Sequence, residues 1–249
     1  MATTPDIFDD SFADMVDDTA LVLCAHGIAG GPGAAADHAR RLREAGQFRD
    51  VAAACLNGSP GLADTVDALS ADRIVVVPYL MAAGRTFKAV LPDRLALARQ
   101  RGKVRLAAPV GTHPAIADLA ASRAEALLLE KGWDRAATLL VLVAHGTPRD
   151  LASAEAARAH ARALAATGGF ADVASAYLDE PPSVAGLLAG RAVRHAVGVG
   201  LFADAGPHGA GDAAAPFARD PDLAYAGPVG PDPRMTAIVR DRAIEALGG

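Results

Sequence analysis

Two histidines occupy matching positions in two similar stretches of this chain. His26 lies in an Ala-His-Gly step directly after an apolar run, and His145 lies in a second such step 119 positions later (26 to 145). The second stretch also contains the acidic pair Asp179 and Glu180, and further on His208. Imidazole accepts protons near neutral pH, and two imidazoles with a carboxylate suit a divalent ion such as Co, Ni or Fe. We therefore expect metal binding coupled to proton transfer.

The similarity between the two stretches extends well beyond the Ala-His-Gly steps. Residues 47–52 resemble residues 169–174, and the Pro-Val-Gly at 109–111 recurs at 228–230. A repeat of this length is much longer than the 20–50-residue period of solenoid proteins. The sequence therefore predicts two domain-sized halves that arose by duplication.

The duplication divides the chain into three parts. Residues 1–18 carry six aspartates and are expected to form a solvated acidic arm. Residues 19–132 and residues 133–249 are predicted to be two related domains, with their joint near Gly132.

Each half alternates apolar strand-like runs with alanine-rich helical patterns. Continuous Val-rich runs such as residues 74–77 indicate strands buried on both faces, which is typical of a parallel sheet covered by helices. Strands are expected near 20–25, 51–56, 73–79 and 104–109, and again near 139–144, 173–178, 195–202 and 223–227. Helices of the first half are expected near 34–46, 61–70, 88–101 and 115–131.

This order of elements predicts an α/β fold of two duplicated, flavodoxin-like domains with parallel sheets. The flavodoxin-like strand order is 2-1-3-4. In such sheets, ligands bind beyond the carboxyl ends of the strands, where the strand order reverses. His145, Asp179 and His208 each follow a strand of the second half. We therefore expect the three side chains to converge on one cleft.

Composition and charge disfavour several kinds of partner. The net charge is −5 and no basic cluster alternates with aromatics, so nucleic acid is not an expected partner. No apolar run approaches the ~20 residues that span a bilayer, and the first residues lack a secretory pattern. We therefore expect no membrane partner and a cytoplasmic location. Cys24 and Cys55 lie in apolar runs and are expected to be buried free thiols.

The basic residues are mostly arginines, since only Lys88, Lys103 and Lys131 among the 24 are lysines. The base composition of the gene is the favoured explanation of this excess. A substrate with several carboxylates is the functional alternative, because the guanidinium fork matches a carboxylate.

An ordered set of motifs resembles the class II tetrapyrrole chelatases, and within them the sirohydrochlorin cobalt and iron chelatases of the CbiX and SirB group. It consists of Ala-His-Gly after the first strand, a Leu-acid step after the second, and Gly-x-His-x-x-x-Asp at 206–212 after the third. The resemblance covers almost the whole chain beyond the acidic arm. It implies insertion of a divalent metal into sirohydrochlorin or a similar macrocycle, for cobalamin or sirohaem biosynthesis, without ATP or redox chemistry.

The resemblance also implies roles for residues of the second half. His145 and His208 would hold the metal and accept the two pyrrole protons, with Asp179 or its neighbour Glu180 as the acidic ligand. Asp212 would either orient His208 or cap a helix. The implied partners are the tetrapyrrole and the metal, Co²⁺, Fe²⁺ or Ni²⁺, which is a substrate, and no further cofactor is expected. The sequence leaves the oligomeric state open.

The first half departs from the family pattern. Thr86 stands where His208 stands in the second half, and Asn57 stands where Asp179 stands. His26 is thus expected to bond locally or to line the far side of the cleft, and the working site is expected in the second half.

The other histidines are expected to be structural. His113 precedes a proline at the start of a predicted helix, which favours a capping role. His38, His160 and His195 have no predicted partners and are expected to be solvated or locally bonded.

Other functional classes are weighed against the chelatase. Residues 31–36 match a loose Gly-x-Gly-x-x-Ala dinucleotide loop, but Asn57 stands where a ribose-binding acid is wanted. A hydrolase is set aside because the sequence has no Gly-x-Ser-x-Gly. The stronger alternative is a non-catalytic homologue that binds a tetrapyrrole or metal and delivers it to a partner.

Overall fold

The computed structural model describes residues 18–27 and 30–248 of the chain. The expected acidic arm falls, apart from Asp18, outside the described residues.

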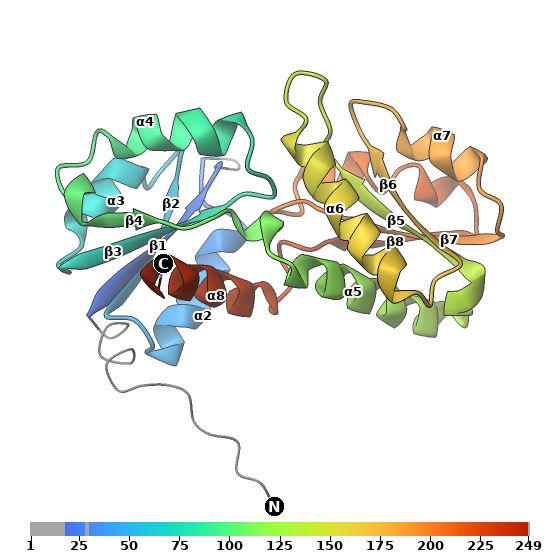
Figure 1. Cartoon of the computed structure of the whole chain (residues 1–249), viewed down its shortest axis with the longest axis horizontal. Helices are drawn as coiled ribbons and strands as arrows, with labels where there is room; N and C mark the ends of the chain where they lie inside the picture. Colours follow the sequence, from blue (N-terminus) through green and yellow to red (C-terminus); the bar gives the residue numbers. More distant parts are fainter. Residues whose placement is uncertain (1–17, 28–29, 249) are drawn as a thin grey trace, which may run out of the picture.

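Two four-stranded parallel sheets lie next to each other, one in each half of the molecule (Figure 1). Their orders are β2-β1-β3-β4 and β6-β5-β7-β8, so both sheets have the predicted order 2-1-3-4. The first sheet consists of β1 (Thr19–Ala25), β2 (Asp50–Cys55), β3 (Arg73–Tyr79) and β4 (Val104–Leu106). The second consists of β5 (Thr138–Ala144), β6 (Asp172–Tyr177), β7 (His195–Gly200) and β8 (Leu223–Pro228). The duplicated α/β fold with parallel sheets is confirmed.

Helices cover both faces of each sheet (Figure 1). They are α2 (Ala34–Ala45), α3 (Leu62–Ala68), α4 (Leu91–Leu95), α5 (Ala115–Lys131), α6 (Ala152–Thr167), α7 (Val184–Ala189) and α8 (Met235–Gly248). Two π-helical turns are η1 (Thr86–Val90) and η5 (Pro207–Asp212). Four 3₁₀ turns are η2 (Arg101–Lys103), η3 (Val110–Thr112), η4 (Arg135–Ala137) and η6 (Phe217–Arg219).

The helix expected near 88–101 is shorter in the structure, where α4 ends at Leu95. The carboxylate of Asp67 on α3 accepts hydrogen bonds from the backbone N–H groups of Arg99 and Gln100, at 3.1 and 3.0 Å. These N–H groups therefore bond to a side chain that is distant in sequence instead of continuing the helix.

Alternate residues of the central strands enter different apolar cores. Leu21 and Leu23 of β1 and Leu140 and Leu142 of β5 all belong to one core, which both halves share. Val22 of β1 belongs to a second core under α3 and α4, and the corresponding residues of β5 belong to a third. Because successive strand side chains point to opposite faces, each buried strand serves two cores.

The last helix of each repeat packs on the sheet of the other repeat. α5 packs against β7, β8 and α6 of the second half, whereas α8 packs against β3, β4 and α2 of the first. Figure 1 shows this exchange, with α8 beside α2 and α5 beside α6. The boundaries 19–132 and 133–249 thus follow the sequence repeat, while the units in space exchange their final helices.

The exchange buries two histidines that were expected to be solvated or locally bonded. The ring of His38 on α2 bonds the Gly230 carbonyl and the Thr236 hydroxyl, both at 2.9 Å. His160 on α6 bonds the Gly111 carbonyl at 2.8 Å. The expectation was wrong for both, because their partners come from the exchanged segments and lie far away in sequence.

Other expectations for single residues have mixed outcomes. His195 has partners that were not foreseen, since it stacks on Trp133 with ring centroids 4.4 Å apart and lies 3.7 Å from an Asp222 oxygen. His113 accepts the Ala115 N–H at 3.2 Å at the start of α5, which confirms its capping role. Both cysteines are buried and free, as expected. Among the described residues, no helix is long and apolar enough to cross a membrane.

The buried His160 should make folding stability depend on pH. Burial lowers the pKa of His160 in the folded chain. In the unfolded chain the imidazole binds a proton below pH ~6.5, whereas in the folded chain protonation requires a lower pH. Stability from this residue is therefore complete above pH ~6.5 and is lost as the pH falls through the folded pKa. We expect urea unfolding at pH 7.5 and 5.5 to show a smaller acid-induced loss for His160→Gln than for the wild type. Equal losses would contradict this assignment.

Candidate functional site

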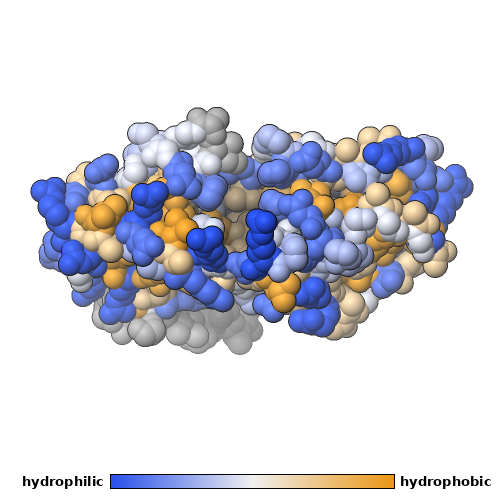
Figure 2. Space-filling view, turned by 90° about the horizontal axis from the view of Figure 1, so that it is seen from above, coloured by the Kyte–Doolittle hydropathy of each residue, from blue (hydrophilic) through white to orange (hydrophobic). Residues whose placement is uncertain are grey.

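Residues that follow the central strands of both sheets line one cleft between the two halves. The cleft has a volume of about 460 Å³, and Figure 2 looks onto the hollow that separates the halves. It is lined by His26, Gly27, Tyr79, Leu80, Met81, His145, Phe202, Ala203, Asp204, Gly206, Pro207, His208 and Gly209. Much of this lining is apolar, which suits a flat organic ligand with apolar faces.

His145 and His208 lie next to each other in this cleft. Their ring centroids are 5.0 Å apart and their planes are inclined by 50°. His145 directly follows β5, and His208 lies in η5 beyond the end of β7. The adjacency of β5 and β7 in the sheet therefore brings together two histidines that are 63 positions apart (145 to 208).

A carboxylate lies beside the Nδ1 atom of each imidazole, and the Gly146 carbonyl oxygen also lies 3.2 Å from Nδ1 of His145. Asp179 Oδ2 lies 3.2 Å from His145 Nδ1, and Asp212 Oδ2 lies 2.9 Å from His208 Nδ1. A ring nitrogen that faces a carboxylate carries the hydrogen, so the Nε2 atom of each neutral ring keeps its lone pair. Of the two roles considered for Asp212, the orienting contact is therefore the one observed.

Asp179 thus occupies the same kind of position as Asp212, beside the Nδ1 atom of an imidazole. Within the described residues, no group of three or more His, Cys, Asp or Glu side chains is arranged to hold a metal ion. The two imidazoles are the donor atoms that the cleft presents together.

The loops around the two histidines are fixed by close backbone packing. Gly146 has a φ of 65°, and a Cβ there would approach the Cβ of Tyr177 to 2.6 Å, so glycine is required. In η5, Pro207 begins the turn, where its missing N–H is not needed. The Tyr225 hydroxyl donates to the Gly209 carbonyl at 2.7 Å and ties this turn to β8.

Glu180, the alternative acidic ligand, packs behind the loop. Its Cγ lies 2.8 Å from where a Cβ on Gly146 would be, and it is not among the residues that line the cleft. Its Oε1 atom is buried with no hydrogen-bond partner among the described residues.

The first half has the same backbone arrangement with different side chains. The Asn57 N–H donates to the His26 carbonyl at 3.0 Å, just as the Asp179 N–H donates to the His145 carbonyl at 3.1 Å. His26 is exposed and lines the cleft, which agrees with the expectation that it lies on the far side. Among the described residues, no carboxylate pairs with its ring.

Asp204 is a cleft residue that the sequence analysis did not identify. Its Oδ1 atom accepts the Ala34 N–H at the start of α2, at 2.6 Å and across 170 positions of sequence. Burial raises the pKa of its carboxyl, and the Ala34 N–H opposes this shift. Gly33 leaves room for the carboxylate, since a Cβ there would lie 2.3 Å from Oδ1. A partner so distant in sequence leaves no local motif to find.

The carboxylate contacts predict an uncommon tautomer for both cleft histidines. We expect long-range ¹H–¹⁵N spectra at pH 8 to show His208 protonated at Nδ1, and Asp212→Ala to move that proton to Nε2. His145 should keep its proton at Nδ1 in Asp179→Ala, because the Gly146 carbonyl oxygen also lies 3.2 Å from this atom. A wild-type His208 protonated at Nε2 would contradict the orientation inferred from the structure.

Comparisons with known proteins agree with this arrangement. A family model described as CbiX matches residues 20–127 and again residues 139–246. A probable sirohydrochlorin cobaltochelatase of Halobacterium salinarum is 29% identical, with 91% of this chain and 91% of that protein aligned.

Two solved structures share the fold over nearly their whole length. One is described as CbiX, the terminal enzyme for biosynthesis of siroheme in denitrifying bacteria. It is 28% identical with a TM-score of 0.71, and the match covers 92% of this chain and 98% of that one. The other, SirB from Bacillus subtilis with Fe³⁺, is 15% identical with a TM-score of 0.76, and the match covers 92% and 96%. The likeness to SirB shows the fold alone.

Proposed function

Because this chain belongs to the CbiX family of sirohydrochlorin chelatases, we propose that it inserts Co²⁺ into sirohydrochlorin, with His145 and His208 as the metal-holding residues. The single observation that carries this proposal is the pair of adjacent imidazoles, 5.0 Å apart in an apolar cleft. Both rings have a carboxylate at Nδ1, which leaves Nε2 as the donor atom and makes it a better ligand.

In the proposed reaction, one divalent ion replaces two pyrrole protons. An imidazole nitrogen that holds a metal has no lone pair left for a proton. The imidazoles therefore hold the ion first, and they accept protons once the ion has bonded to the ring nitrogens. Two N–H bonds of the macrocycle and the two bonds from the metal to the imidazoles would break, bonds would form from the metal to the four macrocycle nitrogens, and the two protons would pass to the vacated Nε2 atoms and then to water. His26, which also lines the cleft, is a further acceptor for these protons.

The choice of Co²⁺ rests on the name of the Halobacterium relative, and it is the finer part of the proposal. Fe²⁺ and Ni²⁺ are the other candidates, because imidazole suits all three ions and selectivity in cells follows geometry and availability. The solved CbiX structure is described as the terminal enzyme for biosynthesis of siroheme in denitrifying bacteria. The product of the reaction would accordingly enter cobalamin or sirohaem biosynthesis.

A non-catalytic carrier is the second candidate function. One observation favours it: the first half has lost its set of site residues, since Asn57 and Thr86 stand where Asp179 and His208 stand in the second half. A carrier would bind the macrocycle in the same cleft, so only turnover separates the two proposals.

The proposed activity predicts a large loss of rate for either cleft histidine. We expect His145→Ala and His208→Ala each to slow Co²⁺ insertion into sirohydrochlorin by about 100-fold or more, because metal holding and proton acceptance are both lost. The measurement is the change in visible absorbance with Co²⁺, Fe²⁺ and Ni²⁺ in parallel. Asp212→Asn should cost about 10-fold to 100-fold, since it disturbs only the orientation of His208.

His195→Ala is the matched control, because this histidine lies outside the cleft against Trp133, and its rate should equal that of the wild type. Binding of the macrocycle with no acceleration for any of the three metals would overturn the enzyme proposal and favour the carrier.

A further inference from the structure

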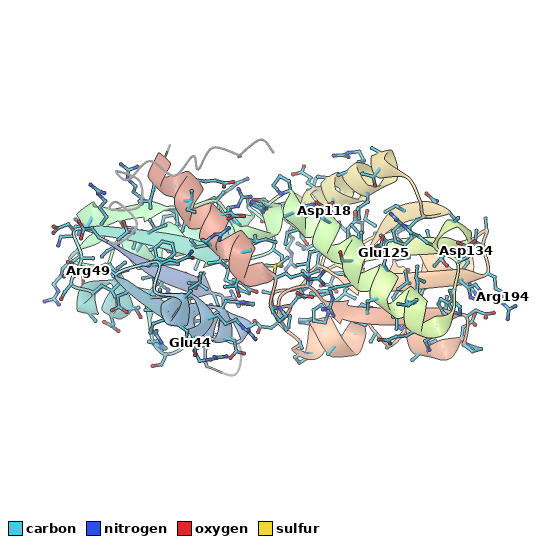
Figure 3. All side chains as sticks on the ribbon, turned by 90° about the horizontal axis from the view of Figure 1, so that it is seen from below. Glu44, Arg49, Asp118, Glu125, Asp134 and Arg194 are labelled. Atoms are coloured by element: carbon cyan, nitrogen blue, oxygen red, sulfur yellow. The ribbon has the colours of Figure 1, made fainter. Side chains whose placement is uncertain are left out.

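Many basic side chains of this protein already have an acidic partner. Arg194 lies 2.9 Å from an Asp222 oxygen and Arg49 lies 3.8 Å from an Asp18 oxygen. Figure 3 shows Arg49 and Arg194 at opposite ends of the molecule, far from the cleft. Surface pairs of this kind contribute little to stability, but each cation in them is partly neutralised.

Three cations on or next to the loops after β3 and β5 form no close ion pair, although Lys88 interacts electrostatically with the Asp150 carboxylate. Arg85, Lys88 and Arg149 are all exposed, and no ion pair or hydrogen bond to their side-chain nitrogens is found among the described residues. Arg85 lies in the loop after β3 that lines the cleft with Tyr79 and the two residues after it. Arg149 is four positions beyond His145. We call these three residues the cation lip.

Backbone hydrogen bonds hold the cation lip together across the two halves. The Asp150 carboxylate accepts the N–H of Arg85 at 2.5 Å and the N–H of Ala152 at 3.1 Å. Gly84 permits this approach, because a Cβ there would lie 2.4 Å from Asp150 Oδ2. The loop after β3 therefore meets the loop after β5, which brings the backbone positions of these cations close together.

The lip is confined to one side of the cleft. The opposite side is built from the corresponding loops after β1 and β7, which meet through the Asp204–Ala34 bond. In the sequence, residues 26–39 and 201–218 contain no lysine or arginine. In the repeat, Pro207 and Ala210 stand where Arg85 and Lys88 stand (an offset of 122). The duplication has thus left a cleft with positive charge along only one rim.

We propose that the cation lip binds the peripheral carboxylates along one edge of the macrocycle and so sets how the ring enters the cleft. This inference rests on the proposed function. The flat faces of a tetrapyrrole can pack on apolar lining such as Leu80 and Phe202, while its carboxylates remain at the perimeter. Guanidinium groups are suited to them because they bind carboxylates through paired hydrogen bonds.

Binding of metal-free porphyrins tests the lip separately from metal insertion. The probes are uroporphyrin, which carries eight carboxylates, and deuteroporphyrin, which carries two, both followed by fluorescence. We expect the Kd for uroporphyrin to rise about 10-fold in Arg85→Ala and in Arg149→Ala, and more in the double variant, because each loses a charge-assisted contact. The Kd for deuteroporphyrin should change less, and added salt should weaken uroporphyrin binding less in the double variant than in the wild type.

Arg73→Ala is the matched control. Arg73 is exposed and begins β3, at the end of the strand away from the cleft. Its substitution by alanine removes the same charge as each lip substitution. The lip variants should fold normally, since Asp150 bonds to the backbone of Arg85 and not to its side chain. If the Kd for uroporphyrin is the same in the double variant, in Arg73→Ala and in the wild type, the proposed role of the cation lip is overturned. If porphyrin binding depends on the cation lip but the protein does not insert a metal, the role of the lip in binding is supported and the proposed function is not.

Discussion

The apolar core that both halves share is the constraint on which the rest of the structure depends. It contains residues from the central strands of both sheets and from the exchanged helices α5 and α8. Since each repeat gives its final helix to the other sheet, neither sheet is fully covered by its own repeat. Burial of this shared surface fixes the two sheets against each other. The ends of β1 and β5 then lie on either side of one cleft, and a site built from both halves becomes possible.

Burial assigns different roles to histidines that the sequence does not distinguish. His38 and His160 are buried at the contact between the halves, where burial lowers their pKa and carbonyl groups occupy ring nitrogens. A buried imidazole whose ring nitrogen is bonded to a carbonyl group in this way is a structural group. His145 and His208 are open to the cleft, and the acceptors beside their rings all lie at Nδ1: Asp179 and the Gly146 carbonyl for His145, and Asp212 for His208. Their second nitrogen remains available, which is the requirement for metal binding and proton transfer.

Duplication has kept the backbone of both sites and changed their side chains. The bond from Asn57 to the His26 carbonyl repeats the bond from Asp179 to the His145 carbonyl, but an amide replaces the carboxylate. The opposite divergence appears at the rims, where Arg85 of the first repeat corresponds to Pro207 of the second. The proposed chemistry thus lies in the second repeat, while two of the three lip cations come from the first. A cleft between two diverged repeats can divide these tasks because each wall evolves separately.

The strands, most of the helices, the strand order, the duplication and the convergence of His145 with His208 could all be predicted from the sequence. These follow from local patterns, since apolar runs indicate strands and the ends of neighbouring parallel strands meet at one edge. Only the tertiary structure decided which sheet each final helix covers, which histidines are buried, and that Asp204 reaches the start of α2 across 170 positions. A local pattern states that a helix has an apolar face, but not which sheet that face meets. That choice depends on the combined packing of both repeats, which no short segment contains.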